Sequence, residues 1–268
     1  MLEVEILKVK HKTQEEARKL LPYIQKTDVH SMEAPMTEES AQFHENDWYK
    51  TRSENWSRSM FERVTRYVMK ELDPEIFDFC LAERSYTYRQ RLPILFLERH
   101  TPDNLKKINE LVSREHNLIL EGITLLEKGK VDEFLQKQWE GIRAQAASVE
   151  MRDRNIGNNL DQAEQIIREK YGELKNKKPL RLTVSIGSRH APEKYTSIPV
   201  SVHYLRGEAK DPTERLAYVL EKASSFEELT PYMLAYGAQQ LINLRKTTLT
   251  LKEIKEITTD ELYKRLSS

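Results

Sequence analysis

Alternating hydrophobic and polar positions mark three segments of the chain as β-strands. The pattern is clearest at residues 180–186, where aliphatic side chains alternate with Arg, Thr and Ser, and it recurs at residues 2–9 and 198–204. A period of two places successive side chains on opposite faces of a sheet. We therefore expect three strands, and the strand at residues 180–186 should bury one face.

Two shorter segments also read as strands. Residues 28–35 form a brief element that ends in Met32-Glu33 and is closed by Pro35. Residues 94–97 are a continuous apolar run, which is typical of a short strand buried on both faces.

The remaining periodicity is helical. Residues 102–178 carry apolar stripes at helical spacing and are predicted to be almost wholly helical. Thr101-Pro102 marks the start, with threonine as the cap and proline in the first helical position. Beyond residue 208, four segments fit the signature of a helix cap with an acidic residue three positions on: Asp211–Glu214, Ser225–Glu228, Thr250–Glu253 and Thr258–Glu261.

These elements predict an α/β fold: a central, mostly parallel or mixed sheet with helices on both faces, a large helical insertion and a helical C-terminal part. We expect a single α/β domain over residues 1–268, with helical insertions at about 36–90 and 102–178. Residues 208–268 form a helical extension, and a separate subdomain there is the alternative. Residues 37–58 are poor in aliphatic side chains, which fits either a lid over a cleft or an amphipathic cover on the sheet.

The composition excludes several classes of protein. With 43 basic and 43 acidic residues, the chain has no overall field that would attract nucleic acid or an anionic membrane. Its single cysteine, Cys80, rules out an internal disulfide and a multi-cysteine metal site. The apolar runs are too short to span a bilayer, and the amino terminus does not look like a signal peptide. We expect a cytoplasmic protein with no nucleic-acid partner, no membrane partner and no nucleotide cofactor; an oligomer is compatible with the sequence.

Four ionisable residues follow predicted strands. His190 comes three residues after Gly187, where the strand pattern stops, while His11, Glu33 and Glu98 follow other strands. The carboxyl ends of parallel strands meet at one edge of a sheet, and ligands bind at that edge in open α/β folds. We therefore expect these side chains to converge there.

Three of these residues, His11, Glu33 and His190, also have a structural interpretation. Thr13 and Glu16 form a capping box, so His11 could simply precede a helix, which Pro22 should kink or shorten. Glu33 could satisfy backbone donors at a helix start, and Gly187 could serve only a turn.

Arg152 lies on the inward stripe of the long helical segment, four residues before Ile156. A guanidinium on a buried stripe is costly unless it meets an anion or a carboxylate, so we expect Arg152 at the site. A structural ion pair with Glu150 or another acid is the alternative. Asp153 is expected to be a charge on the helix surface. Five histidines have no motif around them and are expected to be structural or solvated: His30, His44, His100, His116 and His203.

Taken together, four motifs resemble the superfamily that contains the erythromycin esterases, the ChaN-like proteins, the TraB and GumN proteins and the TIKI proteases. They are a strand followed by His11 and a helix, Asp28-Val-x-x-x-Glu33, Met151-Arg-Asp-x-x-Ile-x-x-Asn-Leu160 and Ile186-Gly-x-x-His190. The chain looks like a TraB-like member or a distant relative. The family typically shows two Gly-x-x-His motifs, and here Lys8 stands where the first glycine would be.

The resemblance implies an α/β fold with a cleft where two histidines, a glutamate and an arginine meet. Some relatives hydrolyse esters or peptide bonds, with metal dependence in the TIKI branch and a metal-free, histidine-based mechanism proposed for the erythromycin esterases. The TraB branch is known for shutting down peptide pheromone signalling. The resemblance leaves the substrate open.

The residues themselves are compatible with two mechanisms. His11, Glu33 and His190 could bind a divalent metal ion that activates a water. Without metal, a histidine could act as general base, oriented by Glu33 or Glu98, while Arg152 stabilises an oxyanion or binds a substrate carboxylate. We predict a hydrolase of an ester or peptide bond, acting on a small molecule or peptide. The alternative is a non-catalytic TraB-like protein that regulates by binding a ligand or peptide.

Overall fold

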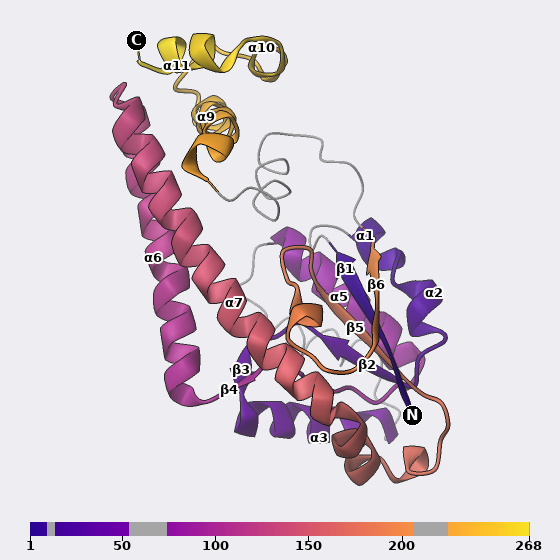
Figure 1. Cartoon of the computed structure of the whole chain (residues 1–268). Helices are drawn as coiled ribbons and strands as arrows, with labels where there is room; N and C mark the ends of the chain where they lie inside the picture. Colours follow the sequence, from indigo (N-terminus) through magenta and orange to yellow (C-terminus); the bar gives the residue numbers. More distant parts are fainter. Residues whose placement is uncertain (10–13, 54–73, 206–224, 268) are drawn as a thin grey trace. The chain divides into compact units, whose positions relative to one another are not determined.

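The computed structural model describes residues 1–9, 14–53, 74–205 and 225–267 (Figure 1). Contacts divide the chain into two compact units, one formed by Met1–Leu105 with Met151–Arg206 and the other by Lys106–Glu150 with Gly207–Ser268. His11, Thr13 and the predicted cap at residues 211–214 lie outside the described residues.

Four parallel strands form the sheet of the first unit, among the residues described. They are β1 (Leu2–Val9), β2 (Val29–Met32), β5 (Leu180–Gly187) and β6 (Val200–Tyr204), in the order β2-β5-β1-β6. β1 and β5 pair along their whole length, with Leu2 opposite Leu180 and Val9 opposite Gly187. The α/β class predicted from the sequence is confirmed.

Helices cover both faces of this sheet. On one face the apolar side chains of β1 and β5 pack against Ile156, Leu160 and Ile167 of helix α7 (Val131–Lys170). Leu7 and Val9 point to the other face, where α1 (Gln14–Arg18), α2 (Leu21–Ile24) and α5 (Pro74–Arg89) lie (Figure 1). The break between α1 and α2, with Pro22 in the first turn of α2, is the interruption that the proline predicts.

The apolar run at residues 94–97 is buried as predicted, but it is not a regular strand. Only Ile94 forms a bridge, to His30 of β2. Side chains replace the missing ladder: the Tyr171 hydroxyl donates to the Ile94 carbonyl at 2.5 Å, and Glu45 Oε1 accepts from the Phe96 N–H at 2.6 Å. Backbone hydrogen bonds at this bridge, from the Leu95 N–H to the His30 carbonyl and from the His30 N–H to the Pro93 carbonyl, join the run to the sheet edge. The two side-chain bonds hold it from outside the sheet.

Short elements complete the first unit. β3 (Met36–Thr37) pairs in parallel with β4 (Arg99–His100), and two 3-10 turns lie at Gly172–Leu174 and Pro192–Lys194. Helix α3 (Glu38–Ser53) buries Ala41 and Trp48 in a cluster with Met32, Ile94 and Phe96. This packing favours the cover over the lid for the described part of residues 37–58.

Helices make up the described part of the second unit. They are the parts of α6 (Pro102–Leu126) and α7 that belong to this unit, and α9 (Phe226–Asn243), α10 (Leu251–Glu256) and α11 (Thr259–Ser267). These helices pack around Phe134, Met233 and Leu234. The predicted caps at Thr101, Ser225, Thr250 and Thr258 all accept a backbone N–H three residues on. Among the described residues, no helix combines the length and the apolar character needed to cross a membrane.

A close approach at Gly157 gives a stability prediction. A Cβ at this position would lie 2.8 Å from the backbone carbonyl carbon of Tyr195, whereas a Cβ at Gly141 would meet nothing closer than 3.6 Å. We expect Gly157→Ala to destabilise the protein by about 1–3 kcal/mol through overpacking. Gly141→Ala, the control in the same helix, should stabilise it by about 0.5–1 kcal/mol through helix propensity. Urea unfolding measures both, and equal stability of the two variants would contradict the packing described.

Candidate functional site

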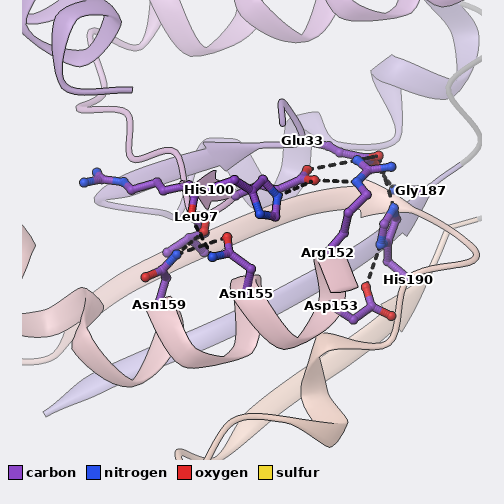
Figure 2. A network of polar contacts seen from close by, with 11 residues as sticks. Glu33, Leu97, His100, Arg152, Asp153, Asn155, Asn159, Gly187 and His190 are labelled. Atoms are coloured by element: carbon purple, nitrogen blue, oxygen red, sulfur yellow. Dashed lines mark hydrogen bonds and ion pairs between the residues drawn. The ribbon is translucent and has the colours of Figure 1, made fainter. Parts of the chain in front are cut away.

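Side chains from two strand ends, the 94–97 run and helix α7 meet in one polar network (Figure 2). Glu33 follows the last residue of β2, Gly187 ends β5, and Glu98 follows the buried run. The register sets Met32 opposite Ser185, so Glu33 and Gly187 lie near the same edge of the sheet. Three predicted site residues, Glu33, Glu98 and Arg152, are thus in direct contact, and His190 joins them through Glu33.

Arg152 is held between two carboxylates. Its Nη2 donates to Glu33 Oε1 at 2.5 Å and to Glu98 Oε2 at 2.9 Å, and its Nε donates to Glu98 Oε1. The paired contact with Glu98 fixes the plane of the guanidinium. The predicted carboxylate partner of Arg152 is therefore present, and it comes from the sheet edge.

Burial and pairing set the charges of this pair. Burial favours the neutral acid, but hydrogen bonds from Arg152 and His100 keep the pKa of Glu98 below its ordinary value. Burial likewise opposes the charge of Arg152, and the two carboxylates outweigh it and raise the pKa of the guanidinium. Both groups are charged at neutral pH.

His190 lies between two further carboxylates. Its Nδ1 is 2.5 Å from Asp153 Oδ1, and its Nε2 is 3.2 Å from Glu33 Oε1. Burial favours the neutral ring, but the charge of Glu33 and the hydrogen bond with Asp153 raise the pKa of His190 to about 9. At neutral pH the ring is therefore an imidazolium that donates a proton toward each carboxylate.

Gly187 lets the carboxylate of Glu33 approach the backbone closely. Its N–H donates to Glu33 Oε2 at 2.6 Å, and a Cβ on residue 187 would lie 3.2 Å from the same oxygen. The carboxylate of Glu33 thus accepts from a backbone amide, a guanidinium and an imidazolium. The structural role predicted for Glu33 was to accept hydrogen bonds from backbone donors at a helix start. A backbone donor does reach Glu33, but it lies at the end of a strand.

The interpretation of Asp153 as a surface charge is wrong. The residue is 4% exposed, and besides its contact with His190 it accepts the Ala191 N–H at 2.8 Å through Oδ2. Its partners come from the chain that follows β5. No local spacing signals this contact, although Asp153 stands directly beside Arg152 in the sequence.

Two other groups near the site are buried and paired. Lys8, the residue in the glycine position of the first motif, contacts Glu193 Oε1 at 2.5 Å and the ring of Tyr204. His100, expected to be structural or solvated, is buried, with Nε2 3.4 Å from Glu98 Oε1. Neither faces open solvent.

A second buried cluster lies on the opposite face of the sheet. His30 contacts Thr87 through Nδ1 at 2.7 Å and Ser185 through Nε2 at 3.1 Å, and Ser185 also bonds Glu83. Burial lowers the pKa of His30 to about 3 and raises the pKa of Glu83 to about 8. Both groups are uncharged at neutral pH, which suits a structural role for His30, as predicted; the pairing with Glu83 has no signature in the sequence.

The network opens to solvent at Glu33 and Arg152. Their side chains are 14% and 15% exposed, whereas those of Glu98, Asp153 and His190 are at most 5% exposed. A molecule entering from solvent therefore meets a carboxylate and a guanidinium first.

Two of the three predicted metal ligands, Glu33 and His190, lie within the described residues. His11 lies outside the described residues, so the full set of His11, Glu33 and His190 stays a prediction. Of the two described members, His190 Nε2 and Arg152 Nη2 both direct protons at the same Glu33 oxygen. A divalent ion there would have to displace the proton of His190 and lie beside a guanidinium, so these two donors as arranged do not fit an ion.

Comparison with known proteins adds no relative. No family model, no curated protein and no solved structure matches this chain.

Loss of Arg152 should be costly for stability. Arg152→Met would leave Glu98 buried without its guanidinium, and breaking a buried pair in this way costs about 3–5 kcal/mol. The control is Arg143→Met, an exposed arginine on the same helix, with an expected change of less than about 0.5 kcal/mol. Chemical denaturation compares the two, and similar losses would show that the buried pair contributes little.

The raised pKa of His190 predicts a pH dependence of stability. The folded-state pKa of about 9 lies above the ordinary 6.5. The resulting stabilisation is fully present below about pH 6.5, falls as the pH rises through about 9, and is on the order of 3 kcal/mol. Unfolding free energies measured from pH 6 to pH 10 should show this loss in the wild type and a smaller one in Asp153→Asn. Parallel pH profiles of the two proteins would contradict it.

Proposed function

We propose that this protein is a hydrolase of ester or peptide bonds whose reacting groups are Glu33, His190 and Arg152. The observation that carries the proposal is the position of His190, a buried imidazolium held by Asp153 on one side and facing Glu33 on the other, next to Arg152. An acid, a base and a fixed positive charge in contact are the groups that acyl transfer to water needs.

Glu33 is the base in this proposal. The side chain of Glu33 is more exposed than that of Glu98, so a water can reach it. A water that enters between Glu33 and His190 replaces their mutual contact, which makes the carboxylate more basic. Glu33 then takes a proton from the water as the water oxygen forms a bond to the acyl carbon.

His190 is the acid. As the bond from the acyl carbon to the leaving oxygen or nitrogen breaks, the leaving atom takes the Nε2 proton of His190. Asp153 keeps Nδ1 in contact and stabilises the ring orientation throughout. The proton on Glu33 then returns to Nε2, 3.2 Å away in the resting state, and both groups are ready for another turnover.

Arg152 supplies the positive charge. Glu98 holds one side of the guanidinium, so its direction is set before substrate arrives. The partly exposed side can stabilise the negative oxygen that develops on the acyl group, or bind a carboxylate of the substrate. A small-molecule ester or a peptide is the substrate class we propose.

The resemblance to the erythromycin esterase, TraB and TIKI superfamily supports the same proposal. Three of the motifs that carry it contribute Glu33, Arg152 with Asp153, and Gly187 with His190, and these residues belong to one network. We propose a TraB-like member or distant relative that acts in the cytoplasm. The predicted metal site of His11, Glu33 and His190 is tested by metal analysis of the purified protein.

The second candidate is a non-catalytic protein that binds a ligand or peptide. Lys8, buried at the end of β1 and paired with Glu193, favours it, because a bulky charged residue occupies the position of a family glycine. A shift in melting temperature on adding peptides, without turnover, would favour this candidate.

Substitution of the proposed acid and its partner tests the hydrolase. His190→Gln and Asp153→Asn should each lower kcat by roughly 10²–10⁴-fold, as expected for loss of general acid catalysis. The matched control is His116→Gln, an exposed histidine on α6, which should keep full activity.

The assay uses a panel of p-nitrophenyl esters and fluorogenic peptides, with circular dichroism to confirm that each variant is folded. Hydrolysis at the wild-type rate by folded His190→Gln would refute the role given to His190. Absence of hydrolysis by the wild type across the panel, together with a peptide-dependent melting shift, would support the binding protein instead.

A further inference from the structure

Helix α7 holds the segment that carries Glu98 through two asparagine side chains (Figure 2). Asn155 Nδ2 donates to the Arg99 carbonyl at 2.6 Å, and Asn159 Nδ2 donates to the Leu97 carbonyl at 2.7 Å. Residues 152, 155 and 159 lie on one face of the helix, because positions three and four apart are neighbours there. The same face therefore binds the backbone on both sides of Glu98 and the carboxylate of Glu98 itself.

The segment depends on these side chains. Only Ile94 of the buried run forms a β-bridge, so the chain from residue 95 to residue 98 lacks a continuous ladder. Three successive carbonyls are fixed from outside: Leu97 by Asn159, Glu98 by the Met36 N–H at 3.2 Å, and Arg99 by Asn155. The backbone of Glu98 is thereby immobilised on both sides.

The two asparagines also act on each other. Asn159 Nδ2 lies 3.3 Å from Asn155 Oδ1, one helical turn away. The oxygen of Asn155 is thus satisfied while its amide nitrogen points at Arg99. This contact orients the Asn155 side chain for its bond to the backbone.

We propose that Asn155 and Asn159 are positioning residues for the reaction: they fix Glu98, and Glu98 fixes the guanidinium of Arg152 toward Glu33. The inference rests on the proposed hydrolase function for its kinetic consequence. Its geometric part stands on the contacts alone. Neither asparagine touches Glu33, Arg152 or His190 in any contact given by the structure, so their effect passes through Glu98.

The first arm of the test observes Arg152 without any substrate. Hydrogen exchange of the Arg152 Nε–H is measured by NMR on protein labelled with ¹⁵N-arginine, and the resonance is identified by its loss in Arg152→Lys. In the wild type the Nε–H is bonded to buried Glu98 and should exchange slowly. Asn159→Ala and Asn155→Ala should each speed this exchange by about tenfold or more, because the carboxylate is no longer fixed.

Asn158→Ala is the matched control. Asn158 is exposed and lies between the two asparagines on the same helix, so the substitution makes the same change in helix propensity without touching the segment. Exchange at Arg152 should be unchanged in this variant. If Asn159→Ala does not fold, Asn155→Ala decides the question.

The second arm measures hydrolysis. Asn155→Ala and Asn159→Ala should lower kcat by about tenfold or more with KM changed by less than about threefold, since a misplaced group acts on the transition state. A lower melting temperature with unchanged exchange at Arg152 would overturn the proposal, because the asparagines would then be structural only. Faster exchange with unchanged kcat would overturn it as well. Faster exchange in the two asparagine variants, together with a wild type that hydrolyses nothing, would support the geometric part and reject the proposed function.

Discussion

The buried contact between Arg152 and Glu98 is the interaction on which the rest of the site depends. Helix α7 supplies the guanidinium and the sheet edge supplies the carboxylate, so one contact joins two elements that are far apart in the sequence. Neither charge would be stable in this environment alone, because moving an ion from water to a protein interior costs several kcal/mol. Glu33, His190 and Asp153 extend the network from this pair, so that positively and negatively charged groups alternate along it.

The parallel sheet explains why these groups meet. β2 and β5 are neighbours and run in the same direction, so the residues that follow them leave the sheet at one edge. Glu33 and Gly187 come together for that reason, and His190 follows Gly187 after a short turn. Helix α7 covers one face of the same strands and brings Arg152 and Asp153 to the same edge.

The sequence predicted the parts of this arrangement that depend on local periodicity. Strand alternation located β1, β5 and β6, and the inward stripe of α7 placed Arg152 among carboxylates. Asp153 was predicted wrongly because a helix stripe defines only one buried direction. The chain at residues 191–195 covers a second side of α7, where it meets Asp153 and Gly157, and periodicity in α7 contains no information about that segment.

The burial of residues 94–97 was predictable from their apolar character. The side-chain bonds that hold this run were not predictable, because Glu45 and Tyr171 come from segments far away in the sequence.

The most direct measurement of the central claim is the protonation state of His190 in the folded protein, followed by ¹⁵N NMR of the imidazole ring. If the ring lies between Asp153 and Glu33 as described, both nitrogens should be protonated at pH 7, with a midpoint near the pKa of about 9. Replacing Glu33 by glutamine should move this midpoint down. A midpoint at or below the ordinary value of 6.5, unaffected by Glu33→Gln, would contradict the coupled network.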